Sequence, residues 1–342
     1  PGNPSILNNL GAIYADDKNY DTAKFYFKKA LQVRPGHKAS SNNLMRVYKL
    51  LNELDSIAFM MKTTSFVDPA SETFMNDMGM LFLDQKRYDS ARIYIRRALA
   101  KDPANAQSLS NMSLVLQGLK QFNSARVYLQ RASRIDPENP IIWANLAVLF
   151  RQLKRYDSAG FYFRKQVMRR DDEPAQKWFA MGNFYEDMKV YDSAVVYFKK
   201  ATEANPKYIA AYTNTGQAYM ALEMYEEARQ FLQQAFNLDS AAYAPAHNLG
   251  LLYHAQSKYP MAIRYLQKAI INDPSKNKAC YELAASYSLN NQPEQAILAI
   301  RQAIQRGYKN YKTLLDDPDF DSLKNLKGFQ DILDQYVPDW RK

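Results

Sequence analysis

The chain has 342 residues, of which 47% are hydrophobic and 23% charged, with 45 Lys and Arg against 35 Asp and Glu. This balance excludes a disordered protein, and the length allows two or three ordinary domains or one long repeat array. No run of about 18 apolar residues occurs, so we expect a soluble chain without a membrane-spanning helix. The single cysteine, Cys280, excludes a framework of intrachain disulfides but leaves the compartment open.

A four-residue motif returns along the chain at a nearly constant interval. YDSA occurs at 88–91, 156–159 and 191–194, and its variants YDTA, FNSA and YEEA begin at 20, 122 and 225. Prolines stand at 1, 35, 69, 103 and 137, always 34 residues apart. The step from 137 to 206 covers 69 residues because QVMRRDDEP (166–174) holds one extra residue. A fixed period of this length indicates an array in which each repeat packs on its neighbours.

The residues inside one period carry a known pattern, which the sixth period shows in full: Trp178, Met181, Gly182, Tyr185, Ala194, Phe198, Ala201 and Pro206. This pattern resembles the W-x₂-L-G-x₂-Y, A-x₃-F and P landmarks of the tetratricopeptide repeat (TPR), a helix–turn–helix of 34 residues. The resemblance covers about nine tenths of the chain. It implies an all-α fold, a right-handed α-solenoid (superhelix) of nine TPR helix–turn–helix repeats with a C-terminal capping segment.

The nine repeats are expected over residues 4–310, with starts at 4, 38, 72, 106, 140, 175, 209, 243 and 277. Residues 1–3 fall where a preceding repeat would end, so either further repeats lie upstream or the chain is an excised piece. Residues 311–342 leave the pattern, and Leu326, Phe329, Ile332, Leu333 and Tyr336 form an apolar stripe there. Because the last repeat of a stack has an uncovered apolar face, we predict a helical cap over 311–342.

Several recurring residues are explained by packing within the repeats. A shared glycine position, Gly182 in repeat six, is expected to let two helices approach closely. The recurring aspartates Asp21, Asp55, Asp89, Asp157 and Asp192 are expected to cap the second helices. Repeat two has Ile57, Met61 and Thr64 where Ala, Phe and Ala are expected. Its second helix should therefore pack less regularly.

Asparagine recurs at the sixth position of six repeats: Asn9, Asn43, Asn111, Asn145, Asn214 and Asn248. In the TPR family, the first helices line a concave inner surface, and this position faces it. A carboxamide can pair with both the C=O and the N–H of an extended peptide. The arrangement resembles the asparagine ladder of the TPR arm of O-GlcNAc transferase, which holds peptide backbones. A second interpretation, hydrogen bonding that only supports the repeat scaffold, stays open at this point.

Further candidates for peptide contact accompany this ladder: Met80, Leu114, Val148, Phe179, His247, Leu251 and Tyr281. Apolar side chains beside amide groups suit a partly hydrophobic extended segment. The alternative is that these side chains pack between neighbouring first helices.

The basic excess of the chain is expected on its outer face. The inner-surface positions hold four basic and six acidic residues, whereas positions 25 and 26 of the repeats hold twelve basic residues and no acidic one. A nucleic-acid binder concentrates basic charge along a groove with interleaved aromatic side chains. A solvated convex face is therefore the simpler explanation, ahead of nucleic acid, an acidic surface or a membrane.

No group of residues has the pattern of a catalytic or cofactor site. His247 and His254 lie seven residues apart, but no third His or Cys is near them in sequence, so no metal is expected. Cys280 falls on a helix-packing position, and no phosphate-binding loop or dinucleotide fingerprint occurs. We therefore expect neither enzymatic activity nor a cofactor.

The sequence thus predicts a non-catalytic protein–protein interaction scaffold that binds an extended peptide segment of a partner in its concave groove. Two alternatives remain: a substrate-recruiting TPR arm of a larger enzyme, and a self-associating assembly module that forms a homo-oligomer. The sequence does not identify the partner.

Overall fold

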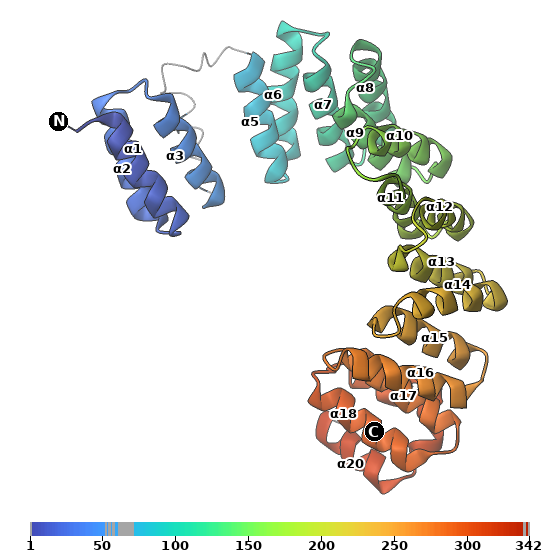
Figure 1. Cartoon of the computed structure of the whole chain (residues 1–342). Coiled ribbons are helices and arrows are strands. Elements are labelled where there is room, and N and C mark those ends of the chain that lie inside the picture. The colour runs from blue at the N-terminus through green and yellow to red at the C-terminus, as the bar shows by residue number, and fades with distance from the viewer. Residues whose placement is uncertain are drawn as a thin grey trace. The chain divides into compact units, whose positions relative to one another are not determined.

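The computed structural model describes residues 2–51, 53, 56, 59–60, 72–337 and 340, and every element in that part of the chain is a helix (Figure 1). The helices up to the middle of the chain are α1 (Pro4–Asp16), α2 (Tyr20–Val33), α3 (Lys38–Leu50), α5 (Glu72–Asp84), α6 (Tyr88–Lys101), α7 (Ala106–Gly118), α8 (Phe122–Ile135), α9 (Pro140–Gln152) and α10 (Tyr156–Met168). They are followed by α11 (Pro174–Asp187), α12 (Tyr191–Ala204), α13 (Ile209–Ala221), α14 (Tyr225–Leu238), α15 (Tyr243–Ala255), α16 (Tyr259–Asn272), α17 (Asn277–Leu289), α18 (Pro293–Gln305), α19 (Lys312–Asp316), the 3₁₀-helix η1 (Pro318–Leu323) and α20 (Lys327–Tyr336).

The helices follow one another as antiparallel pairs of 13 or 14 residues, such as α5 with α6 and α11 with α12. The prediction of an all-α solenoid of TPR helix pairs is confirmed. First helices begin at 4, 38, 72, 106, 140, 174, 209, 243 and 277, so only α11 begins one residue before its expected start. The division into nine repeats with a separate tail, and the handedness of the array, remain proposals. The unusual residues Ile57, Met61 and Thr64 of repeat two lie outside the described residues.

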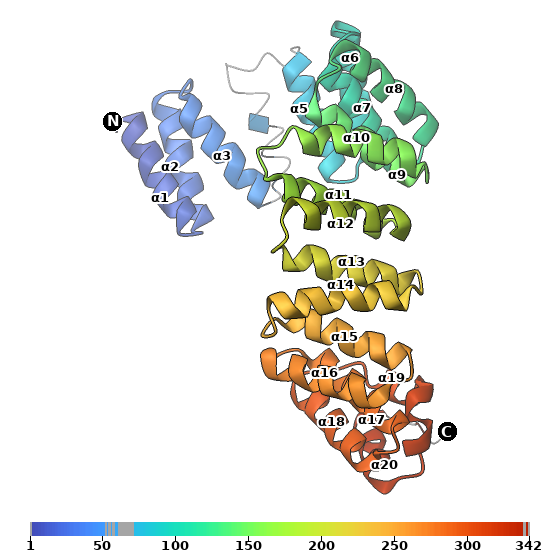
Figure 2. The same cartoon turned by 45° about the vertical axis from the view of Figure 1, so that its right-hand side comes forward.

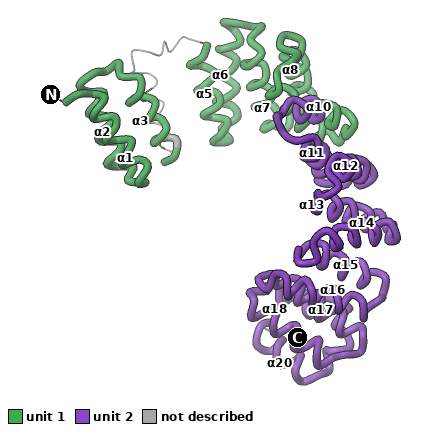
Figure 3. The backbone as a smooth tube through the Cα atoms, viewed as in Figure 1, with its two compact units in different colours: residues 1–162 green, residues 163–342 purple. Residues whose placement is uncertain are grey.

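The chain divides into two compact units, residues 1–162 and residues 163–342 (Figure 3). In the first unit, a buried cluster joins Phe27, Leu44 and Met78. In the second unit, one cluster forms around Leu232, Leu249 and Leu252, and a larger one lies at its C-terminal end. Each unit therefore has hydrophobic cores of its own.

The turn inside each helix pair is fixed by backbone hydrogen bonds. After α1, the N–H of Asn19 donates to the C=O of Tyr14 at 2.9 Å, and that of Lys18 donates to the C=O of Ala15 at 3.1 Å. These are the two bonds of a Schellman motif. Lys18 has a φ of 60°, in the left-handed region that favours glycine. The equivalent residues with φ between 54° and 60° are Lys86, Lys120, Lys154, Lys189, Glu223, Ser257 and Asn291.

Asp21, Asp89 and Asp192 do not cap the second helices, so the prediction was wrong for these aspartates, whereas Asp55 lies outside the described residues. Asp21 is the second residue of α2, and the preceding Asn19 accepts a hydrogen bond from the N–H of Thr22 at 3.3 Å instead. The N-cap of α6 is Arg87, and Asp89 forms an ion pair with Arg92 at 2.8 Å. A carboxylate in the first turn still interacts favourably with the helix dipole.

The predicted close approach of two helices at glycine is present in the repeats. A Cβ added to Gly182 of α11 would lie 2.3 Å from a ring carbon of Phe198 on α12. Phe198 is fully buried, so its ring has little room to retreat. A glycine at this position therefore sets the distance between the two helices of the pair.

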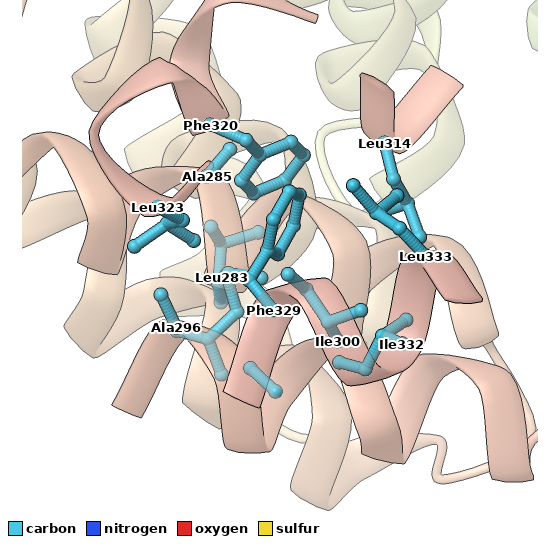
Figure 4. Packing of buried hydrophobic residues seen from close by; sticks show 13 residues of the cluster. Leu283, Ala285, Ala296, Ile300, Leu314, Phe320, Leu323, Phe329, Ile332 and Leu333 are labelled. Atoms are coloured by element: carbon cyan, nitrogen blue, oxygen red, sulfur yellow. The ribbon is translucent and has the colours of Figure 1, made fainter. Parts of the chain in front are cut away.

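The tail after α18 packs against the last helix pair, with α20 against α18 and η1 against α17 (Figure 2). Figure 4 shows the buried cluster that joins them. Of the predicted apolar stripe, Phe329, Ile332 and Leu333 are fully buried, whereas Leu326 and Tyr336 are partly buried. The tail residues Leu314, Phe320 and Leu323 are also fully buried, and the sequence pattern did not indicate them.

We expect Gly182→Ala to lower the free energy of unfolding by about 1–2 kcal/mol, because overpacking outweighs the better helix propensity of Ala. The reverse change in another repeat, Ala147→Gly, serves as the control. It removes a buried methyl group and should also destabilise, by roughly 1 kcal/mol. Urea unfolding monitored by circular dichroism measures both changes. A Gly182→Ala variant as stable as the wild type would contradict the packing argument.

A variant that ends at Asn310 should lose stability, because it exposes the apolar surface of α17 and α18 that the tail covers. The expected result is a lower melting temperature and new binding of a hydrophobic dye. The substitution Lys312→Ala, at an exposed tail residue, is the matched control and should leave both readouts unchanged. If the shortened chain melts with the parent and binds no dye, the tail is not a cap.

Candidate functional site

The six asparagines of the predicted ladder lie at the same position on six first helices. Each is the sixth residue of its helix: Asn9 on α1, Asn43 on α3, Asn111 on α7, Asn145 on α9, Asn214 on α13 and Asn248 on α15. Four of them belong to the first unit and two to the second. We call the side of the first helices that carries them the first-helix face.

In the first unit, ladder asparagines hydrogen bond to the preceding first helix. The Nδ2 of Asn43 donates to the Oδ1 of Asn8 at 3.0 Å, and the Nδ2 of Asn145 donates to the Oγ of Ser110 at 2.9 Å. The Nδ2 of Asn111 donates in the same way to Asn76, at 3.3 Å. Each acceptor lies 35 residues earlier in the chain, at the fifth position of the preceding repeat.

In the second unit, the partners shift by one helical turn. The Nδ2 of Asn214 donates to the Oδ1 of Asn183 on α11 at 3.2 Å. The Oδ1 of Asn248 accepts a hydrogen bond from the Nε2 of Gln217 on α13 at 3.1 Å. Both partners lie 31 residues earlier, at the ninth position of the preceding repeat. The ladder thus joins successive first helices in both units.

The asparagines differ in how much of the amide remains accessible. Asn111 and Asn248 are only 3% exposed, and Asn111 also accepts a hydrogen bond from Gln107 at 2.9 Å. Asn43, Asn145 and Asn214 are half-buried, and their Oδ1 atoms accept no hydrogen bond from the described residues. Asn9 is exposed, and its contact with Asn8, at 3.5 Å, is at the limit of a hydrogen bond.

The partners of the ladder were missed in the sequence. They are Asn8, Asn76, Ser110, Asn183 and Gln217. A usable signal was a polar residue directly before the sixth position, as in NN (8–9) and SN (110–111). The partners of Asn214 and Asn248 have no such signal, because they depend on the offset between two helices.

The apolar candidates are exposed to different degrees. Val148 on α9 is the most accessible, with 38% of its surface exposed, and it lies one helical turn after Asn145. Met80, Leu114 and Leu251 are half-buried. Phe179 packs against Phe198 and Tyr208, with ring centroids 5.4 and 4.9 Å away. Val148 is therefore the apolar candidate best placed to meet a ligand.

His247 and Tyr281 are held by neighbouring groups. The Nε2 of His247 on α15 hydrogen bonds to the carboxylate of Glu282 on α17, and the imidazole stacks on Tyr243. The hydroxyl of Tyr281 donates to the carboxylate of Asp317 in the tail at 2.5 Å. Burial and this hydrogen bond raise the pKa of Tyr281 well above the ordinary value, so the phenol stays neutral.

The described part of the chain has neither a cluster of metal-ligating side chains nor a helix that could span a membrane. No three His, Cys, Asp or Glu side chains there are grouped closely enough to hold a metal ion. His254 binds Ser286 at 2.9 Å and Asp319 at 3.1 Å, and so links α15 to α17 and η1. Among the described helices, none is both long and apolar enough to cross a bilayer.

Comparison with known proteins identifies the family. Family models described as tetratricopeptide repeat match residues 4–37, 63–108, 114–177, 187–249 and 246–278. Together they span most of the chain, which belongs to the tetratricopeptide repeat superfamily. Proteins built on this fold typically act as non-enzymatic interaction modules, and the chain is a protein-interaction scaffold. No curated protein matches the sequence.

Several solved structures also match parts of the chain. The protein described as MamA is 21% identical, with 52% of this chain and 96% of that chain covered and a TM-score of 0.42. A tetratricopeptide repeat protein from Parabacteroides merdae is 18% identical, with coverage of 74% and 97% and a TM-score of 0.42. YrrB, described as a TPR protein with an unusual peptide-binding site, is 19% identical, with coverage of 54% and 95% and a TM-score of 0.36.

The hydrogen bond between Asn145 and Ser110 should contribute to stability. We expect a double-mutant cycle of Asn145→Ala and Ser110→Ala to give a coupling energy of about 0.5–1.5 kcal/mol in urea unfolding. Asn9→Ala is the control, because it brings the same gain in helix propensity without removing a bond between repeats. It should change stability by less than about 0.5 kcal/mol. A coupling energy near zero would show that the ladder does not hold the helices together.

Proposed function

We propose that, within each compact unit, the first-helix face binds an extended segment of a partner protein and catalyses no reaction. The proposal rests on one observation: the side-chain amides of Asn43, Asn145 and Asn214 can each support the scaffold and contact a ligand at the same time. One N–H of each amide holds a neighbouring helix, while the Oδ1 of each accepts nothing from the described residues. These oxygens are acceptors available for the backbone N–H groups of a ligand.

The spacing of the repeats suits an extended ligand. Adjacent packed helices lie about 8–10 Å apart. An extended chain advances about 3.3 Å per residue, so it passes from one first helix to the next in about three residues. The contacts go to the peptide backbone, and such a face accepts different sequences. Specificity would then come from apolar neighbours such as Val148.

Ion pairs contribute little to this proposed contact. On α17, Glu282 is already occupied by His247 and by Lys278, whose Nζ lies 3.6 Å away. On α11, burial and the charge of the neighbouring Asp187 raise the pKa of Glu186 above the ordinary value. Binding at the first-helix face should therefore weaken only mildly with salt.

The two groups of asparagines provide a matched test. Peptides are first selected from a random 12-residue display library on the full chain, and their affinities are then measured for two variants. The first variant carries Asn43→Ala, Asn145→Ala and Asn214→Ala, and the second carries Asn111→Ala and Asn248→Ala. Both variants lose hydrogen bonds between repeats, but only the first loses accessible amides.

We expect the first variant to bind at least about tenfold more weakly, because each lost hydrogen bond contributes about 0.5–1.5 kcal/mol. The second variant should melt at a lower temperature and keep its affinity below that temperature. Equal affinities for both variants and the wild type would overturn the proposal. So would equal losses in both variants, since these would reflect the scaffold alone.

A further inference from the structure

Exposed apolar side chains recur at the same position of the second helices of the first unit. They are Phe25 on α2, Ile93 on α6, Val127 on α8 and Phe161 on α10, each the sixth residue of its helix. Their exposed fractions are 57%, 52%, 52% and 57%. Phe59, at the same 34-residue spacing, is 67% exposed. We call these five residues the outer row.

Charged side chains border the outer row on its two sides. Toward the C-terminal end of each helix, three or four residues after the row, lie the exposed basic residues Lys28, Lys29, Arg96, Arg97 and Arg131. The Nζ of Lys29 lies 5.6 Å from the ring centroid of Phe25. Four residues before the row lie the exposed carboxylates of Asp21, Asp89 and Asp157. The surface is therefore banded, with the apolar row between an acidic and a basic edge.

The basic charge of the protein is concentrated in this unit. Residues 1–162 hold 22 Lys and Arg against 14 Asp and Glu, a formal charge of +8 out of +10 for the whole chain. An exposed apolar row in a soluble domain marks an interaction surface more often than an isolated apolar side chain does. A partner for this surface has to match both features.

We propose that the outer row docks an acidic protein segment whose apolar side chains cover the row and whose carboxylates meet the basic edge. Charge complementarity supports this occupant, since the basic edge and the formal charge of +8 attract an acidic chain and orient it. A segment that crosses the helices can place its carboxylates on one side of the row only. It thereby avoids Asp21, Asp89 and Asp157.

Other occupants fit the banded surface less well. The surface of an anionic bilayer is negatively charged throughout. A bilayer that contacts the basic edge therefore also contacts the acidic edge, about 12 Å away, and is repelled there. A second copy of the chain carries the same positive excess and is repelled. Single-stranded nucleic acid needs aromatic platforms for its bases, and Ile93 and Val127 are aliphatic.

The test uses the full chain and peptides selected on it from a random 16-residue display library. The outer-row variant carries Phe25→Ser, Ile93→Ser, Val127→Ser and Phe161→Ser. A second variant carries Lys28→Glu, Arg96→Glu and Arg131→Glu. The control carries Val33→Ser and Ile135→Ser, which are equally exposed apolar residues at the last positions of α2 and α8. Circular dichroism checks that all the variants fold.

The proposal predicts selected peptides rich in Asp, Glu and apolar residues that bind the outer-row and charge-reversed variants at least about tenfold more weakly than the control. Their affinity should fall steeply with salt, unlike that of ligands of the first-helix face. The absence of any peptide that depends on the outer row would overturn the proposal. So would row-dependent binding of phosphatidylserine vesicles or of single-stranded DNA, or row-dependent self-association in sedimentation, in place of peptide binding. The alanine variants of Asn43, Asn145 and Asn214 should leave this binding unchanged, so the two proposals fail separately.

Discussion

Side-chain amides join five of the described first helices to the first helix before them, and the asparagine ladder depends on these bonds. An amide buried between packed helices has to find hydrogen-bond partners, because an unsatisfied polar group costs about 1–3 kcal/mol. Asn145 meets this requirement with Ser110, and Asn214 meets it with Asn183. The same position that could serve a ligand therefore also fixes the register between repeats. The two interpretations of the asparagine ladder left open by the sequence are compatible.

This double role limits which asparagines can bind. Asn111 and Asn248 are almost fully buried, so their contribution is to the scaffold. Asn43, Asn145 and Asn214 each have an Oδ1 that no described residue donates to, beside the bond that they donate. A ligand held there would stiffen the contact between repeats, because it binds to groups whose orientation the scaffold already sets. The outer row lies on the second helices of the first unit and is bordered by charged side chains, so the two surfaces suit ligands of different chemistry.

Much of the fold could be predicted because the residues that pack the two helices of a pair together recur every 34 residues. Gly182 and Phe198 illustrate this: the landmark residues mark the contact between two helices of one pair. The turns were not predicted, since Lys18 and its equivalents adopt left-handed backbone without the glycine that would signal it. The aspartates were misassigned as caps because the second helices begin two residues earlier than a cap at Asp21 or Asp89 requires.

The tail and the ladder partners show where a sequence pattern stops. Phe320 and Leu323 become buried through a 3₁₀-helix, whose period differs from that of the predicted amphipathic helix. The partner of Asn145 lies 35 residues away and that of Asn214 lies 31 residues away. Which of these two partner positions is used depends on the offset between two neighbouring first helices along their axes. This offset cannot be read from any single residue. The candidate residues were therefore predicted by position, while their accessibility was not.

The central claim is that one position serves both the scaffold and a ligand. Nuclear magnetic resonance of the full chain with ¹⁵N-labelled asparagine observes the side-chain amides directly during titration with a selected peptide. The account predicts that the side-chain amide signals of Asn43, Asn145 and Asn214 shift with the peptide, while those of Asn111 and Asn248 stay in place. Shifts in Asn111 and Asn248 alone, or in none of the five, would contradict it.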